Sequence, residues 1–466
     1  MVSQTTNIDV LVLGGGPAGS AVAGLLAQGG LTVWLVDEDR ERFAAPYETL
    51  LPAALRAIER CGLAEAVRAA SVADSRRHGA VWDTPDLLWH QEAPPGLCLH
   101  RPRFNAAMRD WAARAGAKVQ RGRVAELPDD ARRPVVIDQA DGEPKAVVAQ
   151  LVVLATGRRR SSRVPTERVA QGAETAAFAL SGQAAAGFAD HAVVEAAERG
   201  WSWWIGAPDQ RSVAVVCVDA DELSEHGRRS LVDRVLQQAR GPVASLRGHR
   251  ITGAVRATSR LLRVADQATR SLPVLLVGDA VATLDPLASQ GSEKALVGAE
   301  AAALAIQTAL REPRLTQQAL AWHWRWERDL WQAQQKTAGH FYSRVTRFAG
   351  EHFWRTRSAD EDPPPALPVR LLARADLRET PVLQRRGQEL VEETGFGAPG
   401  IEGLSRVGHV QVGPILAAFA QAATLDEGLR QAGQQPALFA LGPPLVRAAI
   451  DQLWQRGLLV AADEGA

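Results

Sequence analysis

The feature that most constrains the fold is a strand, a glycine turn, a helix and a second strand at the start of the chain. The stretch IDVLVLGGGPAGSAVAGLLAQGG is followed by LTVWLVDEDR. Gly14, Gly16 and Gly19 form a G-x-G-x-x-G pattern, which permits a tight turn and lets a pyrophosphate approach the positive end of the helix. Asp37 ends the second strand, where a carboxylate can accept hydrogen bonds from a ribose. A glycine turn that serves only helix packing is the alternative. Strand, helix and acid in register favour a Rossmann-like dinucleotide site.

Composition narrows the class of protein. The 466 residues carry 53 Lys and Arg against 53 Asp and Glu, which argues against nucleic acid or an anionic membrane as a partner. The 46 % hydrophobic content suffices for two or three domains with their own cores. Cys61, Cys98 and Cys217 have no paired spacing, which argues against a disulfide framework and a metal site. The first apolar run soon turns into glycines and no run is long enough to span a membrane, so we expect a cytoplasmic protein without a signal peptide.

Two later segments have the pattern of a buried strand that ends in a small turn. LVVLATG ends at Gly157, and LPVLLVGDAVATLDPLASQGSEKAL places Gly278 and Asp279 at the exit of its strand. A plain NAD dehydrogenase has no use for the second of these segments. Together with HRPRFNAAM, which matches an R-x-x-F pattern at Arg101, they resemble the FAD-dependent monooxygenases built on the para-hydroxybenzoate hydroxylase plan.

This resemblance implies a noncovalently bound FAD. The implied contacts are the glycine turn, Asp37 and the later residues Arg101, Gly157, Gly278, Asp279, Pro286, Ser289, Gln290 and Gly291. For Arg101, a solvated arginine at a helix start is the alternative to a phosphate contact. The resemblance also implies O2 as co-substrate and, as reductant, either NAD(P)H or a separate flavin reductase.

The implied α/β architecture is a Rossmann-like FAD-binding domain with an inserted α+β substrate domain and a helical, winged-helix-like C-terminal module. We expect the FAD-binding domain at 1–75, 97–170 and 265–315, the substrate domain at 76–96 and 171–264, a helical region at 316–358, a proline-rich linker at 359–368 and the module at 369–466. In the module, Thr424 and Glu427 form a capping box, and a helix from PPLV ends at Gly457 before a short strand. Such a module either grips a peptide or serves as a capping or dimerisation unit.

The stretch GWSWWIG concentrates three tryptophans. In a strand, Trp201 and Trp203 fall on one face and Trp204 on the other, an arrangement that a packed core alone would explain. The stretch also resembles the W-x-W-x-I-P signature of flavin-dependent halogenases and their relatives, matched at Trp201, Trp203 and Ile205. This likeness implies a position between flavin and substrate. YETLLP, from Tyr47, is similar to their G-E-S-L-L-P segment.

Two departures from the halogenase pattern favour hydroxylation. Halogenases carry a lysine before the G-E-S segment, whereas Ala44, Ala45 and Pro46 stand here, and Gly206 replaces the proline of the signature. The expected chemistry is attack of a flavin C4a-hydroperoxide on an electron-rich aromatic ring. The protein then has to exclude water, hold the ring and provide a base that shares its proton.

Three residues near the expected site carry groups that suit such a base: Glu48, Asp285 and His340. Taken singly, each also fits a structural carboxylate or histidine. The extra module and the missing lysine resemble the flavoproteins that help to make tryptophylquinone cofactors, which implies hydroxylation of a tryptophan side chain in a partner polypeptide. Two other functions stay open. One is a small-molecule phenol or indole hydroxylase, or a halogenase with its acceptor moved; the other is a non-catalytic flavoprotein that acts as an assembly or docking factor.

Overall fold

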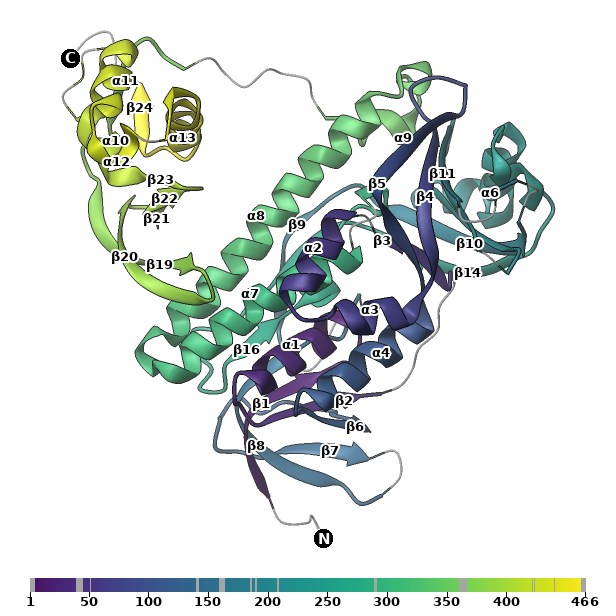
Figure 1. Cartoon of the computed structure of the whole chain (residues 1–466), viewed down its shortest axis with the longest axis horizontal. Coiled ribbons are helices and arrows are strands. Elements are labelled where there is room, and N and C mark those ends of the chain that lie inside the picture. Colours follow the sequence, from purple (N-terminus) through teal and green to yellow (C-terminus); the bar gives the residue numbers. More distant parts are fainter. Residues whose placement is uncertain are drawn as a thin grey trace. The chain divides into compact units, whose positions relative to one another are not determined.

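Figure 1 shows the chain as a computed structural model. It describes residues 5–38, 45–50, 52–139, 142–158, 164–184, 187–188, 191–207, 209–288, 291–359, 367–420, 422, 424–439 and 441–461. The chain divides into two compact units, Met1–Asp360 and Glu361–Ala466, and this division falls within the predicted linker. None of the helices in the described ranges is long and apolar enough to cross a membrane.

The first unit contains a mainly parallel sheet that carries the glycine turn. Its strands are β1 (Thr6–Leu13), β2 (Val33–Asp37), β6 (Lys118–Arg123), β7 (Val135–Gln139), β8 (Lys145–Leu154) and β16 (Val274–Leu276). Strand β1 runs parallel to β2 and β8, and β8 runs parallel to β16. The carboxyl ends of these four strands therefore lie at one edge of the sheet, which we call the nucleotide edge.

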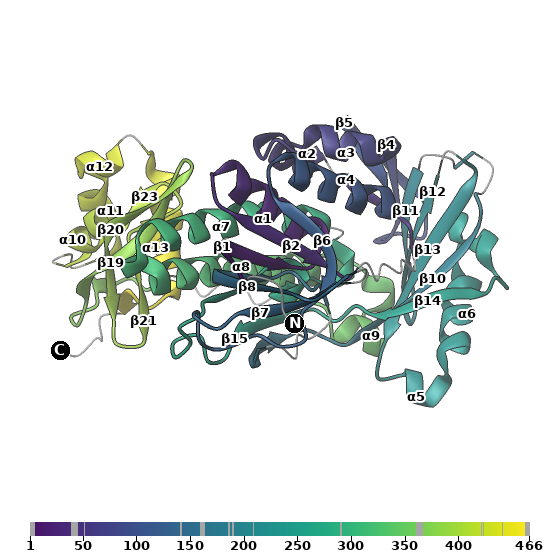
Figure 2. The same ribbon diagram turned by 90° about the horizontal axis from the view of Figure 1, so that it is seen from below.

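Both faces of this sheet are covered, as its continuous apolar strands require. Val10 and Val12 face a core formed mainly by side chains of five helices, with Leu320 of a sixth, and Leu11 and Leu13 face a second core that includes Trp331. The helices of the first core are α1 (Pro17–Gln28), α2 (Pro52–Arg60), α3 (Ala64–Ala70), α4 (Arg101–Arg114) and α7 (Gly291–Arg311). The second core is closed by the long helix α8 (Thr316–Ser343) and a small sheet of β9 (Thr166–Gln171), β15 (Arg260–Val264) and β17 (Ala282–Thr283). Figure 2 shows α7 and α8 running beside β1 and β8.

An eight-stranded sheet forms the rest of the first unit, in the order β14–β10–β13–β12–β11–β4–β5–β3. The strands are β3 (Tyr47–Leu50), β4 (Ser71–Val81), β5 (Leu88–His100), β10 (Thr175–Gln183), β11 (His191–Ala197), β12 (Gly200–Gly206), β13 (Arg211–Asp219) and β14 (Ile251–Arg256). Strand β3 and parts of β4 and β5 come from the ranges predicted for the FAD-binding domain. The sheet thus gathers more of the N-terminal half than the predicted ranges 76–96 and 171–264 contain.

Strand β12, the tryptophan stretch, separates two cores of this sheet. Trp204 is fully buried in a core with side chains of α6 (Arg228–Gln238). Trp201 is buried on the opposite face, with Tyr342 of α8 and Trp354 of α9 (His352–Arg355), and the half-buried Trp203 packs on the same side. The alternation predicted for the three tryptophans is confirmed.

The second unit has a core of its own. Its helices are α10 (Val412–Phe419), α11 (Leu425–Gly433), α12 (Pro436–Phe439) and α13 (Pro443–Gln455). The Oγ1 of Thr424 accepts a hydrogen bond from the N–H of Glu427 at 3.2 Å, as the capping box predicts. After α13, strand β24 (Leu459–Ala461) pairs antiparallel with β18 (Leu371–Ala373). The helical character and the final strand of the module are confirmed.

The prediction of a mainly helical module was incomplete. Strands β19 (Arg378–Arg386), β20 (Glu389–Ala398) and β21 (Ile401–Leu404) form an antiparallel sheet, followed by the short pair β22 (Arg406–Val407) and β23 (Val410–Gln411). Arg386 pairs with Glu389 across a two-residue turn in which Gly387 has a φ of 61°. A glycine in this conformation between two strand-like runs is a hairpin signal, and it is visible in the sequence.

Candidate functional site

The glycine turn after β1 brings α1 close to the end of β8. A Cβ at Gly14 would lie 2.4 Å from the carbonyl oxygen of Ala155, and Gly14 has a φ of 113°. A Cβ at Gly19 would lie 1.9 Å from the carbonyl oxygen of Gly14. Both positions therefore require glycine, one for its backbone conformation and both for the close approach.

Gly16 differs from its neighbours because a side chain there would point into open space. None of the atoms of the described residues lies within 4 Å of the place that its Cβ would take. Helix α1 begins directly afterwards at Pro17, and no described side chain caps this end. The backbone amides and the positive end of the helix therefore form a cradle that fits the pyrophosphate of FAD.

Asp37, at the end of β2, is held against the same turn. Its Oδ2 lies 3.2 Å from Nη1 of Arg109 on α4. The same Nη1 donates to the carbonyl oxygen of Gly15 at 3.4 Å, and a Cβ at Gly15 would lie 2.7 Å from Oδ2 of Asp37. Arg109 orients the carboxylate where a ribose is expected. Nothing in the spacing of α4 singles out Arg109, because it meets Asp37 only through tertiary packing.

Gly278 and Asp279 follow β16 at the nucleotide edge. Gly278 has a φ of 60°, and a Cβ there would lie 2.8 Å from the Cβ of Ala18 in α1. Asp279 accepts a hydrogen bond from Nε of Arg158 at 3.0 Å, next to Gly157, whose φ is 66°. The turns after β8 and β16 therefore meet beside α1, which brings most of the predicted FAD contacts together.

A buried lysine supports this turn from behind. Lys294 of α7 donates from Nζ to the carbonyl oxygens of Gly278 at 2.6 Å and Ala282 at 2.8 Å. Its Nζ lies 3.1 Å from Oε2 of Glu327 on α8, and these two side chains are 2 % and 0 % exposed. Burial and the Lys294 ammonium lower the pKa of the neighbouring His323 to about 3, so this histidine is neutral. Sequence spacing does not reveal this group, because it joins two helices and a turn.

Arg101 and Glu48 form an ion pair with each other. Nη1 of Arg101 lies 2.9 Å from Oε2 of Glu48 and 2.6 Å from Oγ of Ser292. The Ser292 hydroxyl, in the first turn of α7, donates to Oε1 of Glu48 at 2.7 Å. This geometry supports the structural alternative for the Glu48 carboxylate, which ties β3 to the starts of α4 and α7.

Asp285 follows β17 and is held by two hydrogen bonds. Its Oδ1 accepts from the hydroxyl of Tyr342 at 2.8 Å and from the N–H of Leu287 at 2.9 Å. Burial raises the pKa of Asp285, while both hydrogen bonds and the charge of Arg357 act in the opposite direction. A carboxylate in this state binds a proton at higher pH than an ordinary aspartate, which suits a base.

Tyr342 belongs to a cluster that we call the aromatic compartment: Trp82, Trp201, Tyr342, Phe353 and Trp354. The ring of Trp82 lies 6.2 Å from Trp201, 6.4 Å from Tyr342 and 5.3 Å from Trp354. Trp201 is 3 % exposed, and its indole N–H has no hydrogen-bond partner in the part of the chain that the structure describes. The compartment is thus an apolar wall beside Asp285, able to keep water away from it.

The remaining predicted site residues lie in different surroundings. His340 is exposed on α8, and the structure does not bring it to Asp285. Ile205 packs in a smaller core with Tyr47. Pro286 lies in the turn η3 (Pro286–Ala288), and Gly291 begins α7. Ser289, Gln290 and Ala44 lie outside the described residues.

The first unit matches a known protein family. A family model described as FAD binding domain matches residues 7–319, well over half of the chain and the whole nucleotide edge. The chain belongs to the FAD binding domain family. This match supports FAD as the cofactor of the dinucleotide site that the glycine turn, Asp37 and the parallel strands indicate.

Two curated relatives match parts of this FAD binding domain protein. Digeranylgeranylglycerophospholipid reductase 1 of Methanothermobacter thermautotrophicus is 32 % identical over 184 residues, which are 37 % of this chain and 42 % of that protein. Tryptophan 2-halogenase of Chondromyces crocatus is 25 % identical over 334 residues, which are 65 % of this chain and 62 % of that protein. Both matches span less than two thirds of the relative.

Solved structures extend the likeness to the second unit. Peptidyl tryptophan dihydroxylase QhpG, essential for tryptophylquinone cofactor biogenesis, has a TM-score of 0.69 and 26 % identity, with 97 % of this chain and 100 % of that chain covered. The flavin-dependent halogenase CmlS has a TM-score of 0.74 and 19 % identity, with 99 % and 97 % covered. PqsL of Pseudomonas aeruginosa, a probable FAD-dependent monooxygenase, has a TM-score of 0.56 and 22 % identity, with 74 % of this chain and 99 % of that chain covered. The predicted fold and the resemblance to FAD-dependent monooxygenases and halogenases are confirmed.

Proposed function

We propose that this protein is an FAD-dependent aromatic monooxygenase that hydroxylates a tryptophan side chain of a partner polypeptide during tryptophylquinone cofactor biogenesis. The observation that carries the proposal is the match to QhpG, which at 26 % identity extends over 97 % of the chain. Membership of the FAD binding domain family supports an oxidoreductase, and the choice of a tryptophan as substrate rests on this one match.

In the proposed reaction, bound FAD that has been reduced by NAD(P)H or a flavin reductase supplies an electrophilic oxygen atom from O2. The glycine turn, Asp37 and the Gly278 turn hold the cofactor. The aromatic compartment excludes water and places an apolar surface beside the substrate ring. We assign the base to Asp285, because Tyr342 orients its carboxylate and burial raises its pKa.

The distribution of lysines supports hydroxylation over halogenation. The chain has four lysines. Lys118 and Lys145 lie on β6 and β8 of the first sheet, and Lys336 is exposed on α8. Lys294 is buried and bound to Glu327 and to two carbonyl oxygens. None of these ammonium groups precedes Tyr47, the position at which the halogenases of this group carry theirs.

The halogenase is the second candidate, because CmlS matches 99 % of the chain, the second unit included. The second unit alone therefore does not separate a polypeptide substrate from a small molecule. Oxygenation of a ring in a polypeptide differs from halogenation in its product, so the two candidates can be separated by mass.

The test is reduction of the FAD-loaded protein without oxygen, followed by isotopically heavy O2 and one of three probes: a tryptophan-containing peptide, free tryptophan or indole. We expect heavy oxygen in the tryptophan of the peptide and none in a matched peptide with phenylalanine. Brominated product in parallel reactions with bromide, above a hypobromite control, would establish the halogenase. Peroxide release with no product on any probe would support a non-catalytic flavoprotein.

We also propose that residues 369–466 help to hold the polypeptide, which would raise the local concentration of the target ring. Deletion from Pro365 onward should leave FAD content and oxygen consumption unchanged while the product on the peptide falls steeply. A soluble, FAD-loaded truncation that modifies the peptide as fast as the full chain would contradict this role.

A further inference from the structure

Helix α6 and the segment after it carry an excess of positive charge. Residues 228–250 contain six arginines and a single acidic residue, Asp233, although the whole chain is balanced at 53 against 53. The helix lies on the Trp204 side of the eight-stranded sheet, opposite the aromatic compartment. This charge is therefore separate from the residues that surround Asp285.

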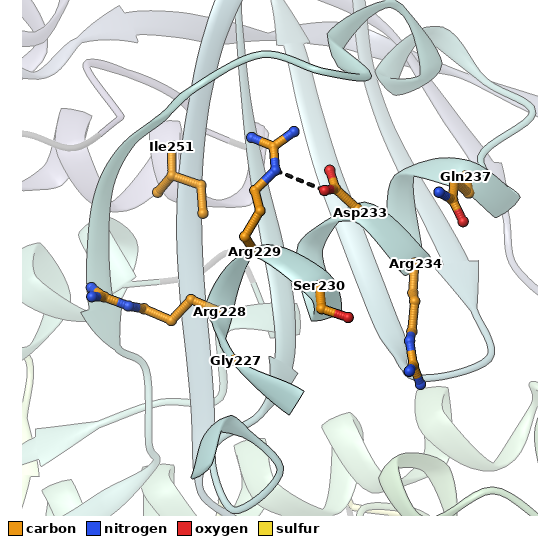
Figure 3. Close-up of a pocket in the computed structure, with 8 residues that line it drawn as sticks. All are labelled: Gly227, Arg228, Arg229, Ser230, Asp233, Arg234, Gln237 and Ile251. Atoms are coloured by element: carbon orange, nitrogen blue, oxygen red, sulfur yellow. Dashed lines mark hydrogen bonds and ion pairs between the residues drawn. The ribbon is translucent and has the colours of Figure 1, made fainter. Parts of the chain in front are cut away.

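The shape of this region is a shallow, open groove. It has a volume of about 960 Å³ and is lined by Gly227, Arg228, Arg229, Ser230, Asp233, Arg234, Gln237 and Ile251. Helix α6 buries Leu231, Val232, Val235 and Leu236 against the sheet, which leaves its polar side facing solvent. Figure 3 shows Arg228 and Arg234 extending away from Asp233 on different sides of the helix.

Two of the arginines, Arg229 and Arg247, form hydrogen bonds or ion pairs within the fold. Arg229 binds Asp233, with Nε 2.7 Å from Oδ2, and donates to the carbonyl oxygen of His249 at 2.6 Å. Arg247 donates to the carbonyl oxygens at the end of α6, including that of Leu236 at 2.8 Å. These contacts neutralise the one acidic group and fix the wall of the groove.

Arg228 and Arg234 are different. Both are exposed, and neither forms an ion pair or a side-chain hydrogen bond with any of the residues that the structure describes. Arg250, at the end of the same segment, is exposed as well. An arginine fork without a partner is suited to bidentate recognition of a carboxylate.

We infer that this basic groove is a docking surface for an acidic segment of a polypeptide. Charge complementarity selects an anionic partner, and the lining residues favour carboxylates over nucleic acid. None of the described residues that line the groove carries an aromatic ring on which a base could stack. Ile251 adds a small apolar contact, which a peptide side chain can use.

This inference deepens the proposed function, on which it rests for the identity of the partner: the acidic segment would belong to the same polypeptide that carries the target tryptophan. Steering by complementary charge raises the rate of encounter and depends on salt. A contact on this side of the sheet would add to any contact made by the second unit.

The test uses the FAD-loaded full chain, a fluorescein-labelled dodecaglutamate peptide as probe, and fluorescence anisotropy at low and high salt. A dodecaglutamine peptide of the same length is the uncharged control, and an oligothymidylate is the nucleic acid control. The variant is Arg228→Glu with Arg234→Glu. The matched control variant is Arg132→Glu with Arg133→Glu, two exposed neighbours outside the groove.

We expect the groove variant to bind dodecaglutamate about tenfold more weakly, because two attractive contacts become repulsive. The control variant should bind as the unchanged protein does, and added salt should remove the difference. Both variants should keep their FAD and their unfolding temperature, since Arg228 and Arg234 are exposed and Glu at the first turn of α6 suits the helix dipole.

Three results would overturn the inference. The first is equal affinity for the glutamate and glutamine peptides, and the second is an equal loss of dodecaglutamate affinity in the groove variant and the control variant. The third is an affinity for the oligothymidylate that exceeds the affinity for dodecaglutamate and is lost in the groove variant. Failure of the proposed function is recognised separately. If the proposed function is wrong, none of the tryptophan probes should contain heavy oxygen. The binding measurement does not depend on this result, because it needs no turnover.

Discussion

The nucleotide edge and the aromatic compartment lie in the same unit and are built in opposite ways. At the nucleotide edge, the backbone makes the site: glycines remove side chains so that α1, β8 and β16 can approach one another. In the aromatic compartment, side chains from four segments make the site, and Trp82 meets Trp201, Tyr342 and Trp354 over long sequence distances. A backbone site leaves a short motif in the sequence, whereas a side-chain site leaves only scattered aromatic residues.

Helix α8 connects these two regions. Its N-terminal half carries Glu327, which pairs with Lys294 behind the Gly278 turn. Its C-terminal half carries Tyr342, which binds Asp285 beside the aromatic compartment. A change at one end of α8 therefore tests whether the two regions are independent.

The largest expected effects come from two valine substitutions in the glycine turn, one of which should prevent folding and the other only FAD binding. Gly19→Val should prevent stable folding, because even its Cβ would lie 1.9 Å from a backbone oxygen. Gly16→Val should fold, since its Cβ meets none of the described atoms within 4 Å, but should lose FAD because the side chain fills the cradle. Circular dichroism and flavin absorbance after gel filtration distinguish the two. A yellow Gly16→Val protein would place the pyrophosphate elsewhere.

The second effect concerns the buried ion pair that joins the nucleotide edge to α8. Lys294→Met should lower the free energy of unfolding by about 3–5 kcal/mol, because it leaves a buried carboxylate and two carbonyl oxygens without their donor. The double variant Lys294→Met with Glu327→Leu should lose less than the sum of the single changes. Urea unfolding measures both, and FAD affinity reports on the Gly278 turn. Additive losses would mean that the two groups do not act as a pair.

The third effect is a dependence on pH from His323. Its pKa is lowered to about 3 in the folded chain, from an ordinary value of 6.5. Below pH 6.5, His323 is protonated in the unfolded chain but stays neutral in the folded chain. Its contribution to the free energy of unfolding is therefore fully present above pH 6.5 and is lost as the pH falls towards 3. The slope should approach about 1.4 kcal/mol per pH unit. His323→Gln should remove this slope, and unfolding of both proteins in urea at several pH values between 7 and 4 measures it. Parallel curves would contradict the assignment.

The smallest effect tests the aromatic compartment. Tyr342→Phe removes one donor to Asp285, which should cost about 1–3 kcal/mol of stability. The same change should raise the pKa of Asp285 further, because the lost hydrogen bond lowers it. The pH profile of product formation should therefore shift to higher pH while FAD content stays the same. Tyr47→Phe is the matched control, since Tyr47 donates to the partly exposed Asp209 at 3.2 Å. Equal shifts in both variants would remove Asp285 from the role of base.

The features that were predictable from the sequence are those that depend on local backbone conformation, as at the nucleotide edge. Gly14, Gly19, Gly278 and the parallel strands around them were predictable, because local motifs specify their conformation and the order of strands follows from it. The alternation of Trp201 and Trp204 across β12 was predictable for the same reason, since it depends only on the period of a strand. The hairpin of β19 and β20 was missed although its turn signal at Gly387 is local.

The partners of the charged residues were not predictable. Arg109 with Asp37, Lys294 with Glu327, and Arg101 with Glu48 all join elements that are far apart in the chain. Sequence reasoning proposed Glu48 and His340 as bases alongside Asp285 because the residue types allow it. The structure gives Glu48 an arginine, leaves His340 at the surface and holds the half-buried Asp285 against Tyr342.

By itself, the sequence determined the nucleotide edge and the elements around it, because backbone conformation at glycines and the period of apolar residues are local properties. FAD as the cofactor was implied by the resemblance of the motifs to FAD-dependent monooxygenases. Only the tertiary structure decided which carboxylate is buried, which arginines are paired and which are free to meet a partner. Burial and pairing depend on the distances between atoms that the chain brings together from remote positions, and those distances set the pKa and the charge that each side chain presents.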